Sequence, residues 1–117
     1  MPYVDYALAG AISAPQGEQI KIETARILSQ YVGKSEQWLY IRINPNQSLF
    51  FRGEQVPVGA IAEVKLVGGV SQQQKQEITT ALGRLLQKEL SIPAEKTYVI
   101  FTEVKGENWG WNGQLFG

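Results

Sequence analysis

Two residue types are missing from this chain of 117 residues: it has no cysteine and no histidine. The absence of cysteine excludes disulfides, thiol catalysis and thiolate metal sites. The absence of histidine excludes catalytic triads that need an imidazole, and any metal would have to be bound by oxygen ligands. No cluster of carboxylates in the sequence suggests such a metal. General acid–base chemistry is therefore left to Asp, Glu, Lys, Tyr or a terminal amine.

The chain also lacks a net charge, because its 11 basic residues are matched by 11 acidic ones. Lysines and arginines are scattered along the sequence, so we expect no nucleic-acid partner. No apolar run approaches the length of a membrane span, and the N-terminus lacks the charged and apolar regions of a signal peptide. These absences predict a soluble, cytoplasmic protein without a membrane partner. The length predicts a single domain over residues 1–117.

Strand and helix patterns alternate along the chain as two β-α-β units would require. The expected strands cover residues 3–9, 38–44, 48–52, 58–68 and 97–104, and the expected helices cover 16–33 and 72–90. Ser71 is the predicted N-cap of the second helix, and Gly33 suits the end of the first. We expect Gly10 to Gly17, which contains Pro15, to be a connecting stretch.

The two halves of the chain, residues 1–57 and 58–117, resemble each other weakly. A shift of about 58 residues places Gly10 on Gly68 and Tyr40 on Tyr98. The predicted fold is α+β: two β-α-β repeats form a four-stranded mixed sheet with two helices on one face. The strand at 58–68 is apolar on its second face too, at Ile61 and Val67. Because no helix is left to cover that face, we infer an obligate homo-oligomer.

Several motifs are present in order along the chain: Pro2 after Met1, the pair Gly33-Lys34, the pair Asn44-Pro45, SIPAEKTYV (91–99) and WGWNGQLF (109–116). Through these motifs the chain resembles the macrophage migration inhibitory factor branch of the tautomerase superfamily. These motifs occur in order over nearly the whole chain. The resemblance implies a homotrimer whose three sheets form a central barrel, with active-site pockets between neighbouring subunits.

The resemblance also implies a cofactor-independent keto–enol tautomerase. In that reaction the amine of Pro2 is the general base and acid, and the substrate is a small aromatic or conjugated keto acid such as phenylpyruvate. Pro2 carries a basic amine only after Met1 is removed, which we expect in the cell. Burial in an apolar pocket and a nearby cation such as Lys34 would both lower the pKa of that amine toward neutrality.

Five further residues are implied as substrate-binding groups. Lys34 would bind the substrate carboxylate, Leu66 would donate its main-chain N–H, and Tyr98 would enter the pocket of the adjacent subunit. Trp111 and Phe116 would form an aromatic wall. Each residue also has a structural interpretation. Lys34 suits the C-terminal end of a helix, and the aromatic residues suit a core or a subunit interface.

The sequence departs from the mammalian pattern at two pocket positions. Ile100 replaces an asparagine that hydrogen-bonds a substrate hydroxyl, so a preference for hydroxyphenylpyruvate-type substrates is not expected. Trp38 replaces a tyrosine near the pocket mouth.

Two other functions stay open on the sequence alone. One is a binding or signalling protein whose tautomerase pocket is vestigial. The other is a hydrolytic dehalogenase, which would need an acidic residue such as Glu103 or Glu107 to activate water. Arg42 and Arg52 invite comparison with dehalogenase relatives that bind carboxylates through arginine, but we expect both to be solvated charges.

Overall fold

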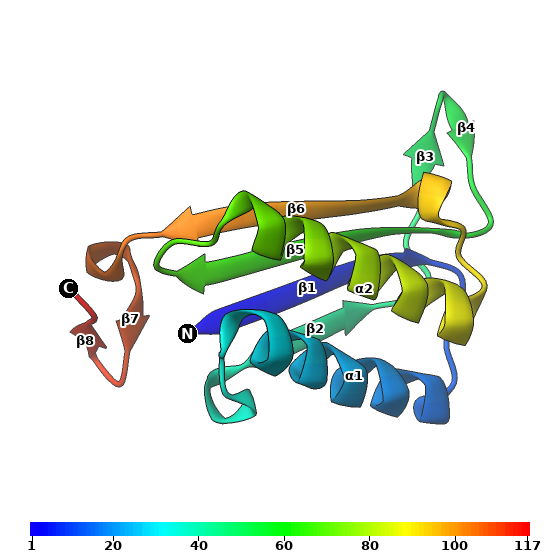
Figure 1. The fold of residues 1–117 in the computed structure, drawn as a ribbon. Coiled ribbons are helices and arrows are strands. Elements are labelled where there is room, and N and C mark those ends of the chain that lie inside the picture. Colours follow the sequence, from blue (N-terminus) through cyan, green and yellow to red (C-terminus); the bar gives the residue numbers. More distant parts are fainter.

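The computed structural model describes residues 1–117. Four strands make the main sheet and two long helices pack on it (Figure 1). The strands are β1 (Pro2–Ala9), β2 (Tyr40–Asn44), β5 (Gly59–Val67) and β6 (Thr97–Val104), and the helices are α1 (Ala14–Val32) and α2 (Gln72–Leu90). Two small hairpins, β3 (Phe50–Phe51) with β4 (Glu54–Gln55) and β7 (Gly110–Trp111) with β8 (Gln114–Leu115), lie at opposite ends of this sheet. Single 3₁₀ turns occur at η1 (Glu36–Trp38), η2 (Ala94–Lys96) and η3 (Gly106–Asn108).

The sheet is mixed, with strand order β2-β1-β5-β6. β1 runs parallel to β2 and antiparallel to β5, and β5 runs parallel to β6. Each half therefore supplies one parallel β-α-β unit, and the two units meet at the antiparallel pair of β1 and β5. This confirms the predicted fold class of a four-stranded mixed sheet with two helices. Neither helix is apolar over a stretch long enough to cross a membrane.

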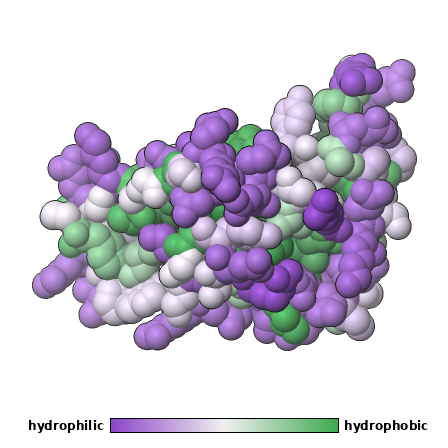
Figure 2. All heavy atoms as spheres, in the orientation of Figure 1, coloured by the Kyte–Doolittle hydropathy of each residue, from purple (hydrophilic) through white to green (hydrophobic).

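The hydrophobic core lies between the sheet and both helices. Alternate residues of the inner strands point into it, as the two-residue period of a strand requires, and the helices contribute one face each. The largest fully buried side chains are Tyr6, Leu8, Ile20, Ile27, Leu28, Leu66, Ile78, Leu82, Leu86 and Ile92. The outer side of the helices carries mostly hydrophilic residues (Figure 2), so α1 and α2 present their polar faces to solvent.

The predicted start of α2 agrees with the structure, whereas that of α1 does not. α2 begins after Ser71, which caps it with a hydrogen bond to the Gln74 amide, as predicted. α1 begins at Ala14, so the expectation that Gly10 to Gly17 is entirely a connection was wrong at its C-terminal half. Ser13 and Gln16 form a capping box there, and Pro15 falls in the first turn, where its missing N–H needs no partner.

The face of the sheet away from the helices is more polar than the sequence predicted. Asp5 on β1 lies between Arg42 on β2 and Glu63 on β5 in the strand register, so the centre of this face is charged. Exposed apolar side chains lie on either side of this charged centre: Tyr98 and Ile100 on β6 are 57% and 43% exposed, and Tyr40 on β2 is 80% exposed. An uncovered apolar surface is therefore present near both edge strands, and charged residues interrupt it.

One polar pair is completely enclosed in the core. The hydroxyl of Tyr6 on β1 lies 2.7 Å from the hydroxyl of Thr24 on α1, and neither residue is exposed to solvent. Burial raises the pKa of the Tyr6 phenol, so this group stays protonated and bonded. The pair ties α1 to the inner strand at a defined position along the helix.

Replacing Tyr6 by Phe should lower the free energy of unfolding by about 1–2 kcal/mol, because the Thr24 hydroxyl is left buried without a partner. The double variant Tyr6→Phe/Thr24→Val should lose less than the sum of the two single variants, since both polar groups are then gone. Denaturant midpoints measured at one fixed protein concentration would check this. Strict additivity of the two changes would contradict the account.

Candidate functional site

The N-terminal end of β1 is enclosed on several sides. Pro2 is buried and lies opposite Leu66 of β5 in the antiparallel ladder. The carbonyl oxygen of Met1 accepts a hydrogen bond of 3.2 Å from the Val67 main-chain N–H. The chain therefore starts inside the sheet's hydrogen-bond pattern, and its terminal amine is held against neighbouring groups.

Lys34 reaches the same place from the end of α1. Gly33 ends the helix in the left-handed conformation, with φ of 64°, which glycine adopts without strain. The Lys34 N–H then bonds back to the carbonyl of Leu28. This turn directs the lysine toward β5, and its Nζ donates to the Val67 carbonyl at 3.3 Å. Burial lowers the pKa of the Met1 α-amine, and the charge of Lys34 lowers it further.

A pocket of about 440 Å³ opens beside this terminus. Half of its lining residues are aromatic, and they include all three tryptophans of the chain. The lining residues are Met1, Pro2, Tyr3, Gln37, Trp38, Leu39, Tyr40, Trp109, Gly110 and Trp111. The Trp38 and Trp111 rings meet edge to face, with centroids 4.8 Å apart and planes at 86°. An aromatic pocket with the terminal amine at one end, and the charge of Lys34 near that amine, suits a flat, anionic ligand.

The structure brings together part of the predicted set of site residues. Pro2 and Trp111 line the pocket, and Lys34 is linked to the N-terminus through Val67. Leu66 pairs with Pro2, but its side chain is in the core, 1% exposed. Phe116 belongs to the same terminal segment as Trp111 and is 42% exposed, outside the pocket lining.

Tyr98 lies at the opposite end of the sheet. It pairs with Ile61, whereas Pro2 pairs with Leu66, five residues further along β5. At about 3.3 Å per residue this separation is roughly 16 Å. Tyr98 instead packs edge to face on Phe51 of the β3–β4 hairpin, with ring centroids 6.0 Å apart. One chain therefore cannot bring Tyr98 and Pro2 to the same small ligand.

Several pocket residues were not singled out from the sequence. Tyr3 and Tyr40 lie side by side in the parallel ladder of β1 and β2, and both line the pocket. Val67, not its neighbour Leu66, has both main-chain polar groups engaged at the N-terminus. These residues become neighbours only through the pairing of the strands, and no local sequence pattern predicts that pairing.

Glu103 and Arg52, two residues considered for other chemistry, have contacts of their own. Glu103 lies 3.0 Å from Lys75 of α2 and accepts a hydrogen bond from the Val70 amide, which lowers its pKa. It therefore anchors the start of α2. The guanidinium carbon of Arg52 lies 5.2 Å from the centre of the Phe51 ring, and Arg52 does not line the pocket beside Pro2. The chain has no group of three or more acidic side chains close enough together to hold a metal ion.

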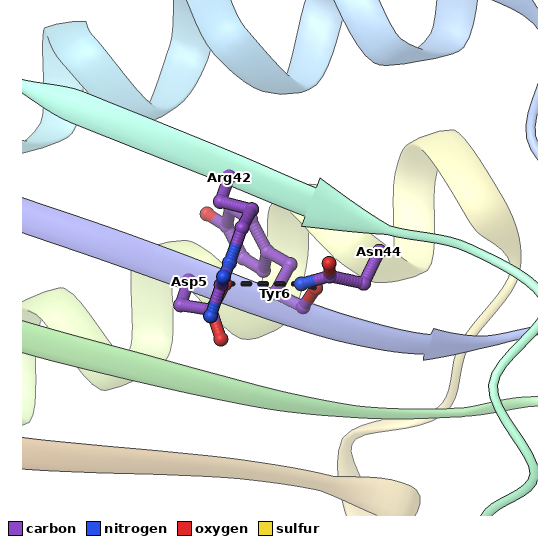
Figure 3. Close-up of polar contacts among 4 residues, drawn as sticks. All are labelled: Asp5, Tyr6, Arg42 and Asn44. Atoms are coloured by element: carbon purple, nitrogen blue, oxygen red, sulfur yellow. Dashed lines mark hydrogen bonds and ion pairs between the residues drawn. The ribbon is translucent and has the colours of Figure 1, made fainter.

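Arg42 is largely exposed to solvent, as expected from the sequence, and it is also paired with Asp5. Its Nε lies 2.6 Å from Asp5 Oδ1, and the Asn44 amide donates to the same oxygen at 3.0 Å (Figure 3). Asn44 also donates to the Tyr6 carbonyl at 2.9 Å, so the three side chains bind β2 to β1. The Arg42 hydrogen bond is the main cause of a lowered pKa for Asp5.

Comparison with known proteins agrees with this α+β fold, in which two β-α-β units share a mixed sheet. The family described as "Macrophage migration inhibitory factor (MIF)" matches residues 1–117. The chain therefore belongs to the macrophage migration inhibitory factor family, within the tautomerase superfamily, and its Pro2 begins the first strand.

Individual relatives are distant in sequence. The macrophage migration inhibitory factor of Xenopus laevis is 30% identical over 89 residues, which is 76% of each chain. The crystal structure of Leishmania major MIF2 superposes with a TM-score of 0.90 at 22% identity, over 99% of this chain and 97% of that one. The crystal structure of Pt0534, inactivated by 2-oxo-3-pentynoate, superposes with a TM-score of 0.87 at 18% identity, over 97% of this chain and 94% of that one. The solved structures bear on the fold alone.

The Asp5 interactions predict a change in stability with pH. An Asp whose pKa is lowered by folding stabilises the protein above its unfolded pKa of about 3.9, and this contribution is lost as the pH falls through the lower folded value. The variant Asp5→Asn should therefore be less stable than the parent near neutrality, and the difference should shrink below about pH 4. Urea midpoints over this pH range would measure it.

Arg42→Met is the matched variant for this experiment, because it removes the main partner and keeps the carboxylate. It should weaken the same pH dependence. A stability difference for Asp5→Asn that stays constant down to acid pH would contradict the assignment.

Proposed function

We propose that this chain, after loss of Met1, is a cofactor-independent keto–enol tautomerase of the phenylpyruvate type. The proposal rests chiefly on one observation: the start of β1 is buried beside an aromatic pocket, with Lys34 held next to it through Val67. The membership of the family supports the same activity. Inactivation of the fold relative Pt0534 by 2-oxo-3-pentynoate is consistent with an oxo-acid site in this superfamily.

In the proposed reaction Pro2 transfers the proton. Its secondary amine removes a proton from the carbon next to the ketone, and the electron pair moves to form the enolate. The protonated Pro2 amine then returns that proton to the enolate oxygen, which completes the enol and regenerates the base, and the reverse sequence restores the ketone. A base with a pKa near neutrality suits this step. The lowered pKa of the Met1 amine supports such tuning, because Pro2 would meet the same burial and the same Lys34 charge.

The other groups stabilise the charge that develops. Lys34 would pair with the substrate carboxylate and with the enolate as it forms. The sequence assigned a main-chain donor to Leu66. The observed bond to Met1 favours the next residue, since removal of Met1 would leave the Val67 N–H free to donate to the substrate. Trp111 would contact the aromatic ring, with Phe116 close to it in the terminal segment.

A trimer supports this function, because Tyr98 is too far from Pro2 in one chain. In a homotrimer with pockets between subunits, the end of the sheet that carries Tyr98 would complete the pocket of the adjacent copy. The exposed Phe50, Tyr98 and Ile100 supply an apolar surface for that contact. Ile100 offers no hydrogen bond, so the substrate class is an aryl or conjugated keto acid without a phenol hydroxyl.

The direct test is phenylpyruvate tautomerisation by Met1-free protein, confirmed by mass. Pro2→Gly should lower kcat/KM by about 10²–10⁴-fold, the usual contribution of a positioned acid–base group. Pro15→Ala is the matched control, since this proline lies in the first turn of α1 and should leave activity unchanged. Equal, near-zero rates in parent and Pro2→Gly would reject the tautomerase for this substrate class and favour a binding protein with a vestigial pocket.

A pocket shared between subunits predicts complementation. The variants Pro2→Gly and Tyr98→Ala should each have low tautomerase activity alone. When equal amounts are unfolded together and refolded, about a quarter of the sites should combine a normal Pro2 with a normal Tyr98, if trimers assemble at random. Activity should rise accordingly above both parents, and a mixture that was never unfolded provides the baseline. Absence of any recovery in mixed trimers, confirmed by mass, would exclude a shared pocket.

A further inference from the structure

The chain ends in a segment that is folded mainly on itself. Residues 105–117 form η3 and the β7–β8 hairpin, and their main-chain hydrogen bonds are internal. The Phe116 N–H donates to the carbonyls of both Gly106 and Trp109, at 3.1 Å each. Residues 110–117 are all exposed. This terminal segment is therefore a small unit that lies beside the N-terminus at one end of the sheet (Figure 1).

One aromatic contact joins the terminal segment to the body of the protein near the pocket. Trp111 of β7 meets Trp38, with ring centroids 4.8 Å apart in an edge-to-face arrangement. Trp38 is well supported on its own side. It ends η1, whose first residue is capped by Ser35, and it is followed by Leu39, which packs on the core. The indole of Trp38 is thus attached to the body, and that of Trp111 to the terminal segment.

The same contact forms part of the pocket. Trp38, Trp109 and Trp111 all line the pocket of about 440 Å³ beside Pro2. Two of these three come from the terminal segment, so the position of that segment decides how wide the pocket is. Pro2 and Lys34, by contrast, are placed by β1 and by the end of α1, independently of the terminal segment.

We propose that Trp38 is a positioning residue that holds the terminal segment, through Trp111, as the movable wall of the pocket. The inference deepens the proposed function and rests on it: the wall binds the aromatic part of the keto acid, while Pro2 and Lys34 act on the oxo-acid part. Loss of the contact should therefore weaken substrate binding and leave the proton-transfer groups in place. Trp38 should set KM and have little effect on kcat.

The experiment compares Trp38→Ala with Trp38→Phe in Met1-free protein. Trp38→Ala should raise KM for phenylpyruvate roughly three- to tenfold, the factor that corresponds to one aromatic pair, with kcat nearly unchanged. Trp38→Phe keeps a ring against Trp111 and should restore most of the affinity. Hydrogen exchange should become faster in residues 105–117 of Trp38→Ala, but not in β1 and not in Trp38→Phe.

Circular dichroism gives a readout that requires no activity. Two indoles in contact at a large angle produce an exciton couplet in the far ultraviolet. This couplet should vanish in both Trp38 variants and persist in Trp109→Phe, which removes the third tryptophan of the pocket and keeps the pair. A couplet that is absent from the parent, or that survives in Trp38→Phe and vanishes in Trp109→Phe, would mean that Trp38 and Trp111 are not in contact in solution and would overturn the proposal.

The remaining outcomes test the positioning role of Trp38 separately from the tautomerase activity. A raised KM in Trp38→Ala without faster exchange in the terminal segment would mean that Trp38 touches the substrate directly, which overturns the positioning role. Unchanged KM and unchanged exchange would overturn it as well. If the parent shows no turnover at all, the tautomerase proposal fails, while the couplet and the exchange data still decide whether Trp38 holds the terminal segment.

Discussion

β1 hydrogen-bonds to β2 along one edge and to β5 along the other, so the first strand of the chain is an inner strand of the sheet. The main-chain N–H and C=O groups on both edges of an inner strand need hydrogen-bond partners. The pairing of β1 with β5 already begins at Pro2. The same antiparallel pairing joins the two halves of the molecule and puts Leu66 opposite Pro2. The terminal amine is consequently ordered by backbone bonds, without a dedicated loop, next to Lys34 and Val67. Preorganisation of this kind is what a positioned base requires.

The two ends of the sheet have complementary character. One end has an aromatic pocket and two amines, and the other has exposed rings at Phe50 and Tyr98. Both edge strands, β2 and β6, are also open in a single chain, so the main-chain groups on their outer sides have no strand partner within it. The charged interactions of Asp5 with Arg42 and Asn44 lie between these ends and hold β2 against β1. These interactions stabilise the sheet and do not line the pocket.

Local patterns predicted the elements whose signals are themselves local. α2 has a serine cap and a regular apolar face, and β6 is a run of β-forming residues, so both agree with the structure. The start of α1 was missed because Pro15 looks like a helix breaker unless the capping role of Ser13 is seen. The polar centre of the open sheet face was missed because Asp5, Arg42 and Glu63 become neighbours only through strand register.

The same distinction applies to the site. Pro2 and Trp111, which the family resemblance named, both line the observed pocket, and their roles in catalysis and binding stay predictions. The roles of Tyr40 and Val67 depend on which residue of one strand faces which residue of the next, and a shift of one position reverses the face. Leu66 was named through the family resemblance, and the hydrogen bonds at the terminus involve its neighbour Val67.

The start of β1 inside the sheet also limits how this protein can be fused to others. Any polypeptide joined before Pro2 would turn its nitrogen into an amide and would have to leave through the space next to the Met1 carbonyl and Lys34. In a tandem gene duplication, only the leading copy could keep a free proline nitrogen, and each following copy would supply only its sheet and its aromatic surfaces. A fused descendant of this fold would thus contain unequal pockets from the moment of fusion, before any residue had diverged.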